Sequence, residues 1–238
     1  MGASNKEELY NDVIRIKRFL GYGTYQCRLN MVAEFKKFGI QLDIIPFRTP
    51  GLRGMAVIGE KPEPDIILLN SNRCEDEQNF DCGHEMMHLS LHRKLNRSTF
   101  NCFDRVSALQ DPFLEWQANE GAAEFYVPYK IFIPLIKEHL HESPQRADVE
   151  NFITWASDYF LVPKAVIRYR LENLKFEIYQ YYMGIEITDI KVLSKNQQEK
   201  RGLFLSSLND IAPGERFDIM NYIEMKNRPV LVALNGLP

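Results

Sequence analysis

The sequence lacks the features that would direct it to a membrane or out of the cell. No apolar run approaches the roughly 18 residues that a transmembrane helix needs. Residues 1–20 carry charges throughout, unlike a signal peptide with its long apolar stretch. The myristoylation pattern needs Ser or Thr at position six, which Lys6 occupies here. The expected location is therefore the cytoplasm.

The sequence also has few cysteines and no excess of basic residues. The four cysteines (Cys27, Cys74, Cys82 and Cys102) form no CxxC pair, which favours reduced and mostly buried thiols. Lys and Arg total 29 against 32 Asp and Glu, so no basic footprint predicts nucleic acid as the main partner. The chain's 238 residues, 45% of them hydrophobic, suffice for one large domain or a domain with an appendage.

The spacing of apolar residues predicts an α+β fold that is mainly helical. Short segments rich in Ile, Val and Leu predict a small antiparallel sheet, with strands at 41–46, 54–58 and 65–70. Helices are predicted at 6–20, 28–38, 78–93, 112–126, 130–141, 145–159 and 163–176. Shorter mixed segments follow Gly184, at 185–192, 202–208 and 229–234. We therefore expect a main domain over 1–184 and a small, β-rich C-terminal appendage over 185–238.

Residues 84–88 read His-Glu-Met-Met-His, an HExxH motif. On a helix, His84 and His88 project from one face, where one metal ion can bind both. Glu85 lies about 100° round the helix, where it can reach a water rather than the metal. The motif thus supplies two ligands and a general base. The alternative is a surface helix with incidental histidines, but the apolar flanks favour a buried helix, in which histidines need partners.

His92 continues the i+4 series but is a poor third ligand. His84 and His92 lie about 12 Å apart along a straight helix, too far for one metal to bind all three histidines. We expect His92 to contact another ligand or simply to end the helix.

A carboxylate on the helix at 112–126 is a better third ligand. Glu115 shares its face with Ala118 and Ala122, whose small side chains let this helix approach the motif closely. Glu120 and Glu124 lie about 140° and 180° away from it. We therefore predict Glu115 as the third ligand. The alternative is that Glu115 only stabilises the first turn of its helix.

These two helices resemble those of the ImmA/IrrE metallopeptidase family. The family pattern is close to E-x-E-A-N-x-F-A-A-x-L-L-M-P, and the chain matches it at Glu115, Ala118, Asn119, Ala122, Ala123 and Pro128. It departs from the pattern at Gln117, where Glu is usual, at Gly121, and at Asp81 before the motif, where Thr is common. Segments 65–70 and 160–171 also look familiar, so the resemblance covers roughly residues 20–175.

The resemblance implies a zincin-like domain with one Zn²⁺ per chain, Glu85 as the catalytic base, and regulated proteolysis of a protein substrate in the cytoplasm. The substrate would be a helix-turn-helix repressor of a mobile element or stress regulon. Tyr126, His92 and Asn119 are candidates to bind the oxyanion. Asn119 is also a candidate to orient the metal-binding histidines.

The sequence is also compatible with two other functions. The protein could be a regulator that keeps the metal but acts by binding a partner without cleavage. It could also bind DNA through the helices at 145–159 and 163–174, because basic residues lie along the second of them or just after it: Lys164, Arg168, Arg170 and Lys175. Acidic neighbours dilute that charge, so a solvated face or a substrate-docking surface is favoured. Apolar residues of the appendage could also bind a partner or pack on the main domain, namely Phe204, Phe217, Ile219 and Tyr222.

Overall fold

The computed structural model describes residues 5–105, 110–141 and 143–217, which fall into two compact units. The first, here called the sheet unit, comprises residues 9–126 and 159–163. The second, the helical unit, comprises residues 127–158 and 164–217 together with 5–8. The whole HExxH motif and Glu115 belong to the sheet unit. The predicted domain boundary after residue 184 stays a prediction.

The sheet unit is built on four strands in the order β1-β3-β2-β4. They are β1 (Gln41–Ile45), β2 (Leu52–Val57), β3 (Ile66–Asn70) and β4 (Thr99–Phe103). The α+β class is confirmed, but the sheet is mixed. Strand β2 pairs antiparallel with β3 and β4, whereas β1 lies on the outer side of β3 and runs parallel to it. Apolar alternation indicates which face of a strand is buried but not the order of the strands, so the purely antiparallel expectation was wrong.

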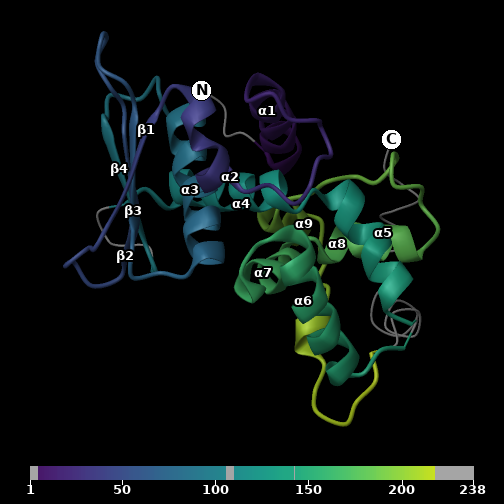
Figure 1. The fold of residues 1–238 in the computed structure, drawn as a ribbon. Coiled ribbons are helices and arrows are strands. Elements are labelled where there is room, and N and C mark those ends of the chain that lie inside the picture. The colour runs from purple at the N-terminus through teal and green to yellow at the C-terminus, as the bar shows by residue number, and fades with distance from the viewer. Residues whose placement is uncertain (1–4, 106–109, 142, 218–238) are drawn as a thin grey trace. The chain divides into compact units, whose positions relative to one another are not determined.

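Helix α3 (Glu75–Leu91) runs alongside this sheet, as Figure 1 shows, and contacts β2, β3, β4 and α4. Helix α4 (Pro112–Tyr126) begins at the predicted proline, and the Asp111 carboxylate accepts a hydrogen bond from the Phe113 amide. The predicted helices at 6–20 and 28–38 correspond to α1 (Lys6–Phe19) and to α2 (Met31–Glu34) with its 3-10 continuation, Phe35–Phe38. Gly39 ends this second helix in the left-handed conformation.

The helical unit contains the remaining helices. They are α5 (Tyr129–His139), α6 (Arg146–Phe160), α7 (Lys164–Asn173), α8 (Lys175–Tyr182) and α9 (Lys195–Lys200). The helix predicted over 163–176 is therefore divided at Leu174 between α7 and α8. A short 3-10 helix, Leu208–Asp210, follows α9.

The β-rich expectation for the appendage was wrong for residues 185–217, which contain no strand and only one isolated bridge, from Arg216 to Gln145. Several of their apolar side chains are buried, among them Ile190, Val192, Leu203 and Leu205. Instead of pairing with a strand, the backbone of this segment forms hydrogen bonds with side chains of α8. The Lys191 carbonyl accepts from Gln180, and the Leu193 amide donates to Glu177. Phe204 is 68% exposed. The segment predicted at 229–234, Ile219 and Tyr222 lie outside the described residues.

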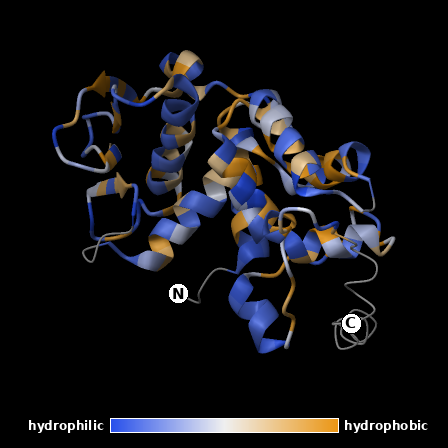
Figure 2. Cartoon of the chain, turned by 90° about the horizontal axis from the view of Figure 1, so that it is seen from below, coloured by the Kyte–Doolittle hydropathy of each residue, from blue (hydrophilic) through white to orange (hydrophobic). Residues whose placement is uncertain are grey.

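No helix among the described residues is long and apolar enough to cross a membrane. In Figure 2 the helices mix hydrophilic and hydrophobic residues along their length. All four cysteines are free thiols, and Cys82 and Cys102 are buried.

Candidate metal centre

Helix α3 places His84, Glu85 and His88 in the interior of the sheet unit, each fully buried. Cys74 is the N-cap of this helix, and its side chain and that of Glu77 form a reciprocal cap. The first turn of the helix is acidic, which suits the positive end of the helix dipole. The two histidines lie one turn apart, with Nε2 atoms only 3.1 Å from each other. This is the juxtaposition that the HExxH spacing predicts.

Helix α4 brings Glu115 to the same point. Its Oε2 lies 3.5 Å from His84 Nε2, and its Oε1 lies 3.6 Å from His88 Nε2. The helices approach closely because Ala118 and Ala122 are fully buried and Gly121 adds no side chain; a Cβ there would lie 3.2 Å from Met87. Helices α3 and α4 are therefore in close contact, with Gly121 of α4 against Met87 of α3.

The other two carboxylates of α4 have partners on helix α1. Glu120 accepts a hydrogen bond of 2.5 Å from the Tyr10 hydroxyl. Glu124 interacts electrostatically with Lys17. Among the described residues, Glu115 is therefore the carboxylate of α4 that joins the two histidines in a group able to hold a metal.

The donor set fits a metal ion. Nitrogen ligands about 2.1 Å from a tetrahedral zinc lie about 3.4 Å apart, close to the 3.1–3.6 Å separations found here. Each histidine can also present a bare Nε2, because its Nδ1 has a partner of its own. His84 Nδ1 lies 3.1 Å from Asn119 Oδ1, the contact expected of an orienting residue.

His88 is held by a longer chain of contacts. Its Nδ1 lies 2.9 Å from His92 Nδ1, and His92 Nε2 lies 3.1 Å from Gln117 Oε1. If His92 donates to Gln117, its Nδ1 accepts the proton of His88 Nδ1, and His88 Nε2 is left as an acceptor. The His88 ring also stacks on Phe100, with centroids 4.7 Å apart. His92 therefore lies beside a candidate ligand.

The charges of the group suit a cation. Burial lowers the pKa of His88 to about 4, so its ring is neutral near pH 7 and able to coordinate. Burial opposes the ionisation of Glu115, but its contacts with His84 and His88 outweigh that effect and lower its pKa to about 2. Two neutral imidazoles and one carboxylate are a common zinc ligand set.

Comparison with known families agrees with this geometry. Residues 35–172 match the family model of peptidase M78, described as the IrrE N-terminal-like domain. The chain belongs to this family. The match spans α3, α4 and the whole sheet, and the family resemblance inferred from the motifs is confirmed. Comparison with curated proteins gives no significant match. As a member of a peptidase family, the chain is expected to act on protein or peptide substrates.

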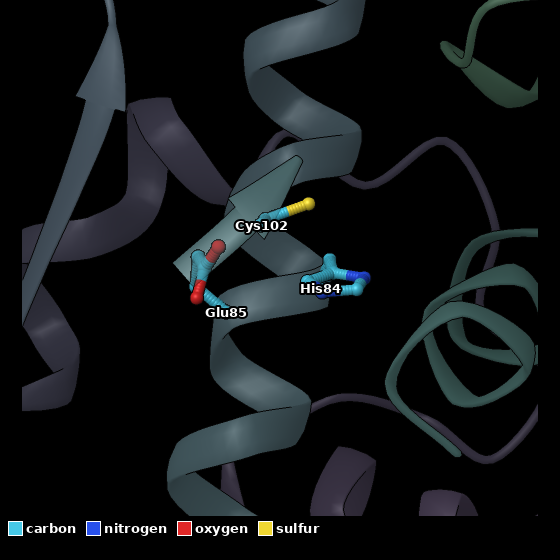
Figure 3. Close-up of side chains that lie close together, drawn as sticks. All are labelled: His84, Glu85 and Cys102. Atoms are coloured by element: carbon cyan, nitrogen blue, oxygen red, sulfur yellow. The ribbon is translucent and has the colours of Figure 1, made fainter. Parts of the chain in front are cut away.

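Glu85 projects from helix α3 on a different side from His84, as Figure 3 shows. It lies against Gly54 of β2, where an added Cβ would come within 2.8 Å of Glu85 Oε1. Among the residues that the structure describes, neither carboxylate oxygen has a hydrogen-bond partner, although the side chain is fully buried. Burial, and then the nearby charges of Asp81 and Glu115, raise the pKa of Glu85 well above its usual range.

Asp81, which stands where the family commonly has Thr, is paired by two arginines. Arg53 Nε donates to its Oδ1 at 2.9 Å, and Arg73 Nε lies 2.6 Å from its Oδ2. The extra negative charge one turn before Glu85 is therefore balanced within the sheet unit.

The three residues proposed to bind the oxyanion or to orient the histidines have different environments. Asn119 and His92 join the histidines, whereas the Tyr126 hydroxyl donates to the backbone carbonyl of Asn79 at 2.5 Å. The sequence did not predict that Gln117 contacts His92, or that Cys102 lies close to His84 and Glu85. The signal for Cys102 was the alternation of strand β4, in which Phe100 and Cys102 face the core.

Proposed function

We propose that this protein is a zinc-dependent intracellular endopeptidase whose zinc is held by His84, His88 and Glu115. The convergence of their acceptor atoms within 3.1–3.6 Å supports this assignment. Zinc is the usual ion for a His₂Glu set with an open position.

When bound, zinc supplies a Lewis acid that polarises the scissile carbonyl and lowers the pKa of a water molecule to about 7. Glu85 accepts the proton of the attacking water and delivers it to the leaving amine. The observation that carries the proposal is the environment of Glu85: it is fully buried, directly follows His84, and has no hydrogen-bond partner on either oxygen among the described residues. A purely structural metal site has no use for such a carboxylate.

The proposed substrate is a protein, namely a helix-turn-helix transcriptional repressor. This follows from the family resemblance and from the selectivity that a protease inside the cell requires. We do not propose direct DNA binding, because two of the three cations of α7, Arg168 and Arg170, are paired or buried. Arg170 is buried, and Arg168 forms two hydrogen bonds with Glu150. Lys175, at the start of α8, pairs with Glu172.

The test compares wild-type protein with Glu85→Gln, using as candidate substrates any helix-turn-helix repressor encoded next to its gene and, separately, unfolded casein. The variant should keep its zinc and lose roughly 10²–10⁴ in cleavage rate, because it lacks the general base. Wild-type cleavage by the variant would refute the role of Glu85. Rapid, unselective digestion of casein would favour a housekeeping peptidase. Repressor binding without cleavage by zinc-loaded wild type would favour the regulator that acts by binding.

A further inference from the structure

A second group of possible ligands lies beside the proposed zinc centre. Ligand atoms of His84, Glu85 and Cys102 all lie within 4.8 Å of one another, and all three residues are buried. Figure 3 shows how they meet: His84 and Glu85 project from α3, and Cys102 projects from strand β4. The group shares only His84 with the set formed by His84, His88 and Glu115.

The surroundings of Glu85 distinguish this group from an isolated cysteine. Cys102 pairs in register with Gly54 of β2, and Gly54 lies against the Glu85 carboxylate. The missing side chain at Gly54 leaves room for that carboxylate next to the thiol. Within the described part of the chain, both oxygens of Glu85 lack a hydrogen-bond partner, although the residue is fully buried. A buried carboxylate without a partner is costly, and a cation would stabilise it.

We propose that Cys102, Glu85 and His84 form a second metal site, which takes a thiophilic divalent cation such as cadmium or excess zinc. A thiolate, an imidazole and a carboxylate together favour such ions over magnesium or calcium, which prefer oxygen ligands alone. On binding, the bond from Sγ to the ion replaces the S–H bond, and the thiol proton passes to solvent.

Such an ion inhibits cleavage, because it occupies the general base and competes for His84. This consequence rests on the proposed function, whereas the binding itself does not. The two are therefore tested by separate measurements.

The binding test starts from full-length, zinc-loaded protein carrying Cys27→Ser and Cys74→Ser, so that the two less buried thiols do not bind the probe. Because both sites use His84, cadmium must compete with zinc for that residue. Serine at position 74 preserves the cap of α3. Cadmium ions are the probe, and the readouts are the ultraviolet absorption of a cadmium–thiolate bond and the affinity from equilibrium dialysis. Adding Cys102→Ser should abolish the band and weaken cadmium binding at least about tenfold, since even residues that only orient a ligand are worth 10–100-fold.

The matched control is Cys82→Ser, which removes the other buried thiol and should leave the band intact. If Cys102→Ser does not fold, Cys102→Ala provides the same comparison. Absence of the band, or its loss in Cys82→Ser with retention in Cys102→Ser, would overturn the second site. Zinc content and repressor cleavage, measured without cadmium, report on the proposed function alone.

Discussion

At the scale of single residues, the contact between Gly54 and Glu85 gives a sharp prediction. A methyl group at position 54 would lie 2.8 Å from Glu85 Oε1 and 3.2 Å from its Cγ, so the carboxylate must move. Gly54→Ala should therefore lower the cleavage rate by up to about 10²-fold, the cost of a displacement near 1 Å in an active site. The zinc content should not change, because none of the proposed ligands is touched.

The control for this substitution is Gly23→Ala in the same unit, where an added Cβ meets nothing closer than 3.7 Å. Cleavage and metal content are measured on both variants. An unchanged rate in Gly54→Ala would show that the position of Glu85 against β2 does not matter for catalysis.

Much of the candidate site could be predicted residue by residue. Helical spacing alone brings His84 and His88 together, and the small face of α4 selects Glu115 over the other two carboxylates. Cys102 and Gln117 could not be placed in the same way. Their contacts depend on the pairing of β4 with β2 and on the angle between α3 and α4, and local spacing determines neither.

At the scale of elements, helix α1 meets α4 through buried polar side chains, among them Lys17. Its Nζ donates to the Gln26 carbonyl at 2.8 Å and lies 5.3 Å from the centroid of the Phe125 ring. Burial lowers the pKa of Lys17 to about 8, even though Glu124 acts in the opposite direction. Keeping this buried ammonium charged therefore lowers the free energy of unfolding at neutral pH.

The sign of this effect can be tested by changing the pH. The pKa of Lys17 is lower in the folded state than its ordinary value of 10.5, so the cost is full below about pH 8 and disappears as the pH rises toward 10.5. Over that window, the free energy of unfolding of the wild type should rise relative to Lys17→Met. Urea unfolding of both proteins at about pH 7 and about pH 10 measures the difference. Exposed Lys36→Met controls for the loss of one positive charge, and a constant difference from Lys17→Met would contradict the account.

Some helices and strands could be predicted from the sequence, and others could not. The predicted helices over 6–20, 78–93 and 112–126 are present with small shifts at their ends, since amphipathic spacing and capping residues mark them. Strand β4 was missed, because its five residues follow the polar segment at 93–98 without a strong turn signal. The parallel pairing of β1 with β3 is a property of tertiary structure that no local pattern contains.

At the scale of the whole molecule, the segment after Gly184 is part of the helical unit through residue 217. Gln180 of α8 donates to the Lys191 carbonyl at 2.7 Å and accepts from the Lys191 amide at 2.9 Å. Glu177, also buried, accepts from the Leu193 amide at 3.0 Å and pairs with Lys6. Through these hydrogen bonds the segment packs against α8.

Truncation after Gly184 should therefore destabilise the helical unit. Each buried polar group left without its partner costs about 1–3 kcal/mol. The zinc content should be retained, because the proposed ligands all lie in the sheet unit, whereas cleavage of the repressor should be impaired. Urea unfolding, elemental analysis and a cleavage assay give the three readouts. An unchanged unfolding midpoint would show that the segment contributes nothing to the stability of the unit.

The central claim is that His84, His88 and Glu115 hold the metal, and elemental analysis of His88→Ala tests it most directly. The matched control is His139→Ala, which removes an exposed histidine of the helical unit. We predict one zinc per chain in the wild type and in His139→Ala, and a large loss of zinc in His88→Ala, because only two ligands remain. Full zinc content in a folded His88→Ala protein would contradict the account.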